Sequence, residues 1–164
     1  MKGLVHYCIF LLGLLLFSQS LFAQKLVKEN RYKSWSVNCY QQENSEKQNC
    51  LLMQTIVLKE TNSRLMQIAI AKQSKEATAR ITIPLGVFIP NGVTLQVDKG
   101  EKNAYPLLHC DQQGCHTTIR LNSIMITGLK AGNQLTVTFS DMTQRSIGVP
   151  VSLLGFTAGL TALE

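Results

Sequence analysis

The sequence predicts an all-β sandwich with a short C-terminal helix, and three observations lead to this fold class. Apolar and polar residues alternate with a period of two in several short segments, which is typical of half-buried strands. Gly, Pro and Asn turn signals separate these segments at intervals of about 8 to 12 residues. Four cysteines of the expected mature chain would add two disulfides to the core of a domain of this size.

The first residues have the layout of a secretory signal peptide rather than of a domain. Lys2 supplies a positive start, residues 9–17 form an apolar run, and residues 18–20 turn polar. This run is shorter than the roughly 20 residues that a membrane-spanning helix needs, which argues against an uncleaved anchor. We therefore expect residues 1–23 to be a signal peptide that is removed.

The expected mature chain begins at one of two positions. Cleavage after Ala23 would leave Gln24 as the first residue, and cleavage after Ser20 is the alternative. Residues 24–164 are enough for one domain and too few for two, so we expect a single β-sandwich domain. A signal peptide predicts an exported address, which extends as far as the cell surface or the medium.

The cysteines predict a disulfide framework. Once the leader is removed, the even number of cysteines in an exported chain implies two bridges, for which three connectivities are possible. Pairing of Cys39 with Cys50 and of Cys110 with Cys115 is favoured, because each pair is local and flanks a polar loop. Loops this short predict a stabilisation of roughly 2 to 3 kcal/mol per bridge.

Two other interpretations concern the residues around the second cysteine pair. His109, Cys110, Cys115 and His116 could form a zinc site, but the spacing is not that of a CxxC pair and an oxidising compartment favours the disulfide. His109 and His116 with Asp111 could form an acid–base cluster, but alternation puts His116 on the exposed face of its strand. Because the sequence also contains no nucleophile-elbow, zinc-protease or phosphate-loop motif, we expect no enzyme, metal or cofactor.

The formal net charge of +6 does not predict a nucleic-acid partner, because an exported chain rarely meets nucleic acid and the basic residues are scattered. The one cluster is at the expected mature N-terminus and consists of Lys25, Lys28, Arg31 and Lys33. A solvated, partly mobile tail is the expected interpretation, and attraction to an anionic cell or lipid surface is the alternative.

The strand pattern begins at the only tryptophan. Trp35, Val37 and Cys39 share one face of a short strand, and Trp35 is expected to anchor the core. Residues 50–58 are apolar on both faces and predict a buried strand, and residues 64–72 return beside them as the second strand of a hairpin.

The middle of the chain continues this succession of short strands. Residues 77–83 predict a strand that ends at a proline, and residues 93–97 and 115–121 predict two more by their alternation. Residues 85–89 lie between two prolines, so they predict an extended edge or a crossover rather than a central strand. This segment is also our candidate surface for binding a partner.

The last part of the chain combines strands and helices. Residues 122–126 predict one capped helical turn, and residues 134–139 and 147–151 predict two further strands. A final helix of about ten residues begins at Ser152 or Gly155, and two glycines spaced four residues apart would let it lie close against a sheet.

Three long motifs follow one another along the chain: PLGVFIPNGVTLQVD at residues 84–98, YPLLHCDQQGC at 105–115 and VPVSLLGFTAGLTAL at 149–163. Together with the early Trp35 and the four cysteines they resemble the invasion-associated locus B family of exported bacterial proteins. The resemblance implies an immunoglobulin-like β-sandwich in the periplasm or envelope of a Gram-negative bacterium, linked in pathogenic members to invasion of host cells.

The resemblance brings no catalytic residues with it, and two functions remain. One is a non-catalytic binding module at the envelope that contributes to host-cell contact or virulence. The alternative is a periplasmic housekeeping factor, either a stabiliser of envelope proteins or a small-ligand binder, without direct host contact. The expected partner is a protein or an anionic cell surface; we expect no nucleic acid and no membrane anchor after signal cleavage.

Overall fold

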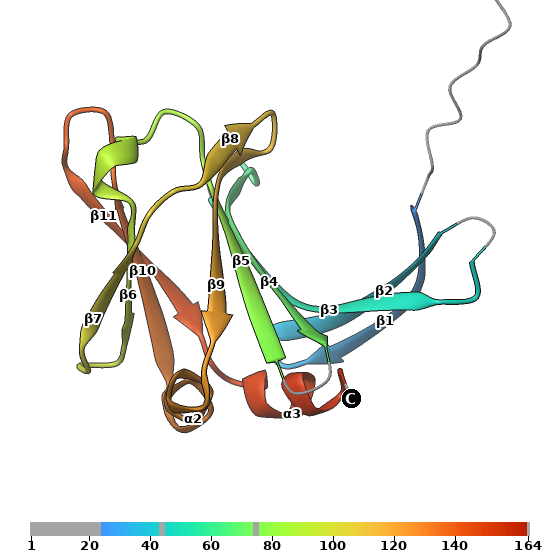
Figure 1. The fold of residues 1–164 in the computed structure, drawn as a ribbon. Coiled ribbons are helices and arrows are strands. Elements are labelled where there is room, and N and C mark those ends of the chain that lie inside the picture. Colours follow the sequence, from blue (N-terminus) through green and yellow to red (C-terminus); the bar gives the residue numbers. More distant parts are fainter. Residues whose placement is uncertain (1–23, 43–44, 74–75, 164) are drawn as a thin grey trace, which may run out of the picture.

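The computed structural model describes residues 24–42, 45–73 and 76–163, and it confirms the predicted all-β fold. Two antiparallel sheets pack face to face as an immunoglobulin-like sandwich, with two short helices at one end (Figure 1). The predicted signal peptide, with both predicted cleavage sites, lies outside the described residues. In the part of the chain that is described, no helix has the length and apolar character needed to cross a membrane.

The first sheet has seven strands in the order β1-β2-β3-β4-β5-β9-β8. Each of the first four strands pairs with the next one along the chain, and β5 then pairs with β9. The bounds are β1 (Gln24–Tyr32), β2 (Trp35–Gln42), β3 (Gln48–Val57), β4 (Arg64–Gln73), β5 (Glu76–Ile83), β8 (His109–Asp111) and β9 (Gly114–Leu121).

The second sheet has four strands in the order β11-β10-β6-β7. The bounds are β6 (Val93–Val97), β7 (Lys102–Tyr105), β10 (Gln134–Ser140) and β11 (Ser146–Ser152). Residues 84–92, which include the 3₁₀ turn η2 (Ile89–Asn91), carry the chain from the first sheet to the second. Of the two alternatives predicted for residues 85–89, the crossover is therefore confirmed.

The two helices are α2 (Ser123–Ala131) and α3 (Phe156–Thr161). Asn122 caps α2 as predicted, because its side-chain oxygen accepts a hydrogen bond of 2.9 Å from the Met125 N–H. The helix continues well beyond the single turn that we expected. Gly155 precedes α3 with a φ of +89°, so the second of the two predicted starting points is confirmed.

The core lies between the sheets and continues under α3. Trp35 is only 2% exposed, and its indole N–H donates a 2.9 Å hydrogen bond to the Ser152 carbonyl. Its ring meets the Phe156 ring edge to face with centroids 5.3 Å apart. The predicted role of Trp35 as a core anchor is confirmed, since the residue joins β2, β11 and α3.

The basic N-terminal segment is a strand, which corrects the prediction of a partly mobile tail. Every residue of β1 except Asn30 and Tyr32 is exposed, yet the strand pairs with β2 along its length. A register shift at Val27 leaves Lys28 opposite Cys39 and Arg31 opposite Ser36. Residues directly opposite share a face, so Lys28 and Arg31 point to different sides of the sheet and the basic residues do not form one patch.

The prediction that β3 is buried on both faces is also wrong. Only Leu52 and Gln54 of this strand are buried, and Val57 is 46% exposed. The physical reason is that a sheet in a sandwich meets the core with one face only. The apolar residues on the other face of β3 therefore remain half-exposed.

The two disulfides join Cys39 with Cys50 and Cys110 with Cys115, which is the local pairing that the sequence favours. In both cases the two cysteines lie directly opposite each other on neighbouring strands, β2 with β3 and β8 with β9. Because both sulfur atoms of the second pair are bonded to each other, they cannot serve as thiolate ligands in the competing zinc site.

Candidate functional site: an apolar pocket between the sheets

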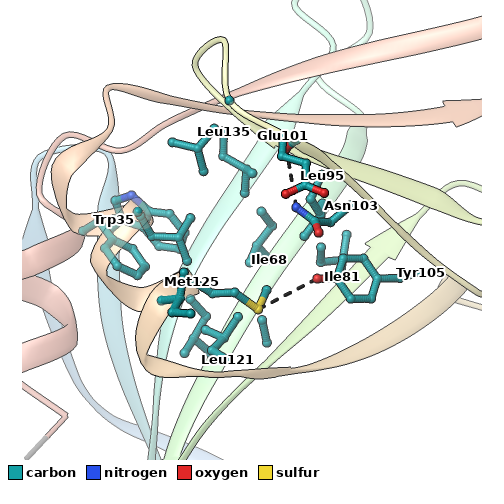
Figure 2. Close-up of a pocket in the computed structure, with 18 residues that line it drawn as sticks. Trp35, Ile68, Ile81, Leu95, Glu101, Asn103, Tyr105, Leu121, Met125 and Leu135 are labelled. Carbon is teal, nitrogen blue, oxygen red and sulfur yellow. Dashed lines mark hydrogen bonds between the residues drawn. The ribbon is translucent and has the colours of Figure 1, made fainter.

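A pocket of about 270 Å³ lies between the two sheets (Figure 2). Ile68 and Ile81 line it from the first sheet, and Leu95 and Leu135 line it from the second. All four side chains are at most 9% exposed, so the wall of the pocket belongs to the hydrophobic core. The side of the pocket toward α3 is formed by Trp35 with Phe156.

Small residues among large ones explain why the core is not filled here. Ala79 occupies a position of β5 between the larger residues of the wall, and Gly128 of α2 faces the same space. A Cβ atom added at Gly128 would meet nothing within 4 Å. Protein cores normally contain few voids larger than a water molecule, so a pocket of this size is unusual in a core.

The mouth of the pocket lies between β7 and α2. Glu101, Asn103 and Tyr105 line one side, and Met125 lines the other. The Tyr105 hydroxyl donates to the Met125 sulfur at 3.8 Å, and Figure 2 shows the two side chains facing each other across this side of the pocket. Ile124, which also lines the pocket, is 81% exposed and extends the apolar surface outward.

The size and chemistry of the pocket indicate an apolar ligand. An engineered cavity of about 150 Å³ is sufficient to bind benzene, and this pocket is larger. Among the described residues that line it, Glu101 is the only one with a formal charge at neutral pH, and it is exposed at the mouth.

A second hollow of about 390 Å³ lies on the other face of the first sheet and is polar. Ser36, Asn38 and Tyr40 of β2 line it, with Arg31 at its border. The Asn38 side-chain oxygen is buried and has no hydrogen-bond partner in the described structure. The lining of this hollow is polar, so it offers less apolar contact surface to an apolar ligand than the pocket between the sheets does.

The expected exposure of His116 is wrong, because its side chain is buried. Alternation does place it on the outer face of β9, opposite Thr82 of β5. However, His109 and Asp111 of β8 lie over it: the two imidazole centroids are 4.8 Å apart, and Asp111 Oδ1 is 2.9 Å from His116 Nε2. The short strand β8, which the sequence pattern did not reveal, causes this burial.

Hydrogen bonds connect Thr82, His116 and Asp111 in a row, which is the order of groups in a nucleophile–base–acid relay. Thr82 Oγ1 lies 3.0 Å from His116 Nδ1, and the hydrogen bond with the His116 ring holds the pKa of Asp111 below its ordinary value. Yet Thr82 is only 8% exposed and lines neither hollow described above. The hydroxyl is therefore largely shielded from solvent.

The crossover that we selected as a candidate contact surface lies at the end of the sandwich away from the helices (Figure 1). Its Leu85 and Ile89 are 58% and 52% exposed. The crossover is bridged to the β10–β11 turn through Val87 and Asp141, and that turn carries Met142, 66% exposed. Large apolar side chains are therefore exposed together at this end, which we call the apolar loop end.

Comparisons with known proteins agree on one family. The model described as "Invasion associated locus B (IalB) protein" matches residues 35–164. Invasion protein B homologs of Brucella abortus, from strain 2308 and from biovar 1 strain 9-941, are each 22% identical over 150 residues, which is 90% of this chain and 86% of the relative. The crystal structure of invasion associated protein B from Bartonella henselae has a TM-score of 0.75 at 23% identity, over 84% of this chain and 95% of that one, and shows the same fold.

Proposed function

Because this chain belongs to the invasion associated locus B family, we propose that it is an exported, non-catalytic binding protein of the bacterial cell envelope. Its ligand is an uncharged, largely apolar small molecule or chain segment that enters the pocket between the sheets. The observation that carries the proposal is the apolar wall of that pocket, which extends from the exposed mouth at β7 and α2 into the core.

The walls determine which ligands fit. Aliphatic and aromatic side chains cover the interior, so burial of apolar ligand surface supplies the affinity at about 25 cal/mol per Å². Polar groups lie at the mouth, where Asn103 and Tyr105 could bind a hydroxyl or amide at the end of the ligand. Glu101 at the mouth disfavours an anionic end group, so a neutral ligand is preferred over a carboxylate.

The proposal includes two further points, namely that the protein is exported and that it is not an enzyme. The leader-like layout of residues 1–23 and two disulfides support an oxidising compartment outside the cytoplasm. The buried position of Thr82 and His116 supports a structural role for their hydrogen-bonded relay with Asp111. Replacement of His116 should therefore change stability and leave ligand binding at the pocket intact.

Ligand binding can be tested with residues 24–164 and the uncharged fluorescent probe N-phenyl-1-naphthylamine. We expect saturable binding of one probe per chain and displacement by straight-chain alcohols. Gly128→Leu places a side chain in the pocket mouth, where a Cβ meets no neighbour, and should weaken probe binding about tenfold or more. Lys130→Leu adds the same side chain to the same helix outside the pocket and should bind like the wild type.

Two results would contradict a ligand pocket. The first is a lack of saturable probe binding by the folded chain, and the second is unchanged binding by Gly128→Leu. Circular dichroism and thermal unfolding of both variants establish that they are folded. Because glycine is unfavourable inside a helix, Gly128→Leu should be at least as stable as the wild type, so lost binding cannot be attributed to unfolding.

The apolar loop end favours a second candidate function, contact with a protein partner, which in this family would be the route to a role in invasion. Clustered exposed apolar side chains on a small domain are typical of such contacts. Surface proteolysis of intact cells that express the full-length chain is the test. Cleavage on intact cells supports host contact, whereas cleavage only after the outer membrane is opened supports a periplasmic binding protein.

A further inference from the structure

The β8–β9 hairpin gathers three side chains with metal-ligating atoms, namely those of His109, Asp111 and His116. These atoms lie within 4.8 Å of one another. The register places His109 directly opposite His116, and the neighbouring pair is the disulfide between Cys110 and Cys115. The disulfide fixes the hairpin, so the backbone holds the three side chains on one side of it independently of any ion.

His116 is held in place at both ring nitrogens. Its side chain is buried, with Nδ1 lying 3.0 Å from Thr82 Oγ1 and Nε2 lying 2.9 Å from Asp111 Oδ1. A histidine that binds a metal is usually oriented by a hydrogen bond at its other nitrogen, and Thr82 is placed to supply it. Nε2 then points to the side where Asp111 and His109 lie.

We propose that His109, Asp111 and His116 bind one divalent cation of the zinc or copper class. Two imidazoles and one carboxylate suit these ions, and a water molecule would complete a tetrahedral site. Bonds of about 2.0 to 2.1 Å require ligand atoms about 3.3 Å apart in such a site. His109 and Asp111 are exposed and can rotate the remaining distance toward the fixed His116.

Arg80 provides a second test of the proposed cation site, because its removal should change the affinity in the opposite direction. Its Nη2 atom lies 3.5 Å from His109 Nε2, so a guanidinium stands beside the candidate site. A fixed positive charge at this distance opposes a cation. Removing it should strengthen binding, whereas a variant that merely disturbs the hairpin should weaken it.

The experiment is calorimetric titration of Zn²⁺ into residues 24–164 with both disulfides intact. We expect one ion per chain. His109→Ala and Asp111→Asn, both at exposed positions, should each weaken binding by about tenfold or more. Arg80→Gln should bind several-fold more tightly, and Arg120→Gln, at an exposed position of β9, should bind as the wild type does.

The location of the ion can be read from the imidazole nitrogens. Zn²⁺ should shift the ¹⁵N resonances of His109 and His116, which are the two histidines of residues 24–164. The proposal is overturned if millimolar Zn²⁺ produces neither heat nor a shift, or if His109→Ala binds with wild-type affinity. Probe binding at the apolar pocket is independent of this result, so either site can fail without the other.

Discussion

At the scale of single residues, Asp141 shows how a turn can depend on charge. Its carboxylate accepts hydrogen bonds from the Thr143 hydroxyl at 2.7 Å and from the Thr143 N–H at 2.8 Å, and the Arg145 side chain donates to it as well. Above all the Thr143 hydroxyl lowers the pKa of Asp141 from 3.8 to about 2. The fold therefore favours the ionised carboxylate.

The stability of the protein should fall in acid in the corresponding window. A lowered pKa in the folded state contributes stability that is complete above about pH 5 and is lost as the pH falls through about 2. Asp141→Asn cannot titrate, so thermal unfolding between pH 5 and pH 2 should show the difference from the wild type shrinking as the pH falls. A difference that stays constant with pH would contradict this assignment.

Residues differ in how well the sequence predicts them. Trp35 and Asn122 were assigned correctly, because a lone tryptophan within alternating apolar residues and an asparagine before a helix each have one favourable role. His116 was assigned to the correct face and the wrong environment. Alternation fixes the direction of a side chain, but burial depends on which other strand lies over it.

At the scale of elements, α3 depends on the absence of a side chain at Gly155. An added Cβ atom would overlap the carbonyl oxygen of Tyr32, and the φ of +89° is unfavourable for other residues. Gly159, one turn on, similarly lies against Leu52. The two glycines therefore let the helix approach β1 and β3, as the sequence predicts.

Gly155→Ala should destabilise the protein by about 2 kcal/mol or more, since strain at φ and a backbone overlap add together. Urea unfolding of the variant measures the loss. Thr157→Ala on the exposed side of the same helix is the control and should change stability by no more than about 0.5 kcal/mol. Equal effects of the two substitutions would show that α3 does not depend on close approach.

The elements that the sequence missed are edge strands. β1, with the sequence QKLVKENRY, and β7, with the sequence KNAY, are mostly exposed and carry little alternation. Both lie at the ends of their sheets, where a strand needs an apolar face less than a central strand does. By contrast, β6 and β10 have neighbours on both sides, and their alternation revealed them.

At the scale of the whole molecule, the disulfides supplement a core that contains an open pocket. The two bridges span 11 and 5 residues. Loop entropy then predicts losses of about 3 kcal/mol when Cys39 and Cys50 are replaced by alanine, and about 2 kcal/mol when Cys110 and Cys115 are replaced. Urea unfolding of the two double variants measures this order, and the reverse order would contradict it.

The pocket itself is beyond what a linear pattern can predict. Its wall includes buried residues of strands that the sequence predicts correctly, such as Ile68 of β4 and Leu95 of β6. A void arises from the mismatch of side-chain volumes across two sheets, and that mismatch depends on register and twist. The fold class could therefore be predicted from periodicity, but the candidate site required the packed structure.

The meander of β1 to β5 has a consequence for the order of folding. Each pairing between consecutive strands of this meander closes a short loop, so these five of the seven strands in the first sheet can pair rapidly and early in folding. The second sheet and β9 must wait for residues far along the chain. The Cys39–Cys50 disulfide lies within these five strands, so it can form before the second sheet has folded and before the pocket exists.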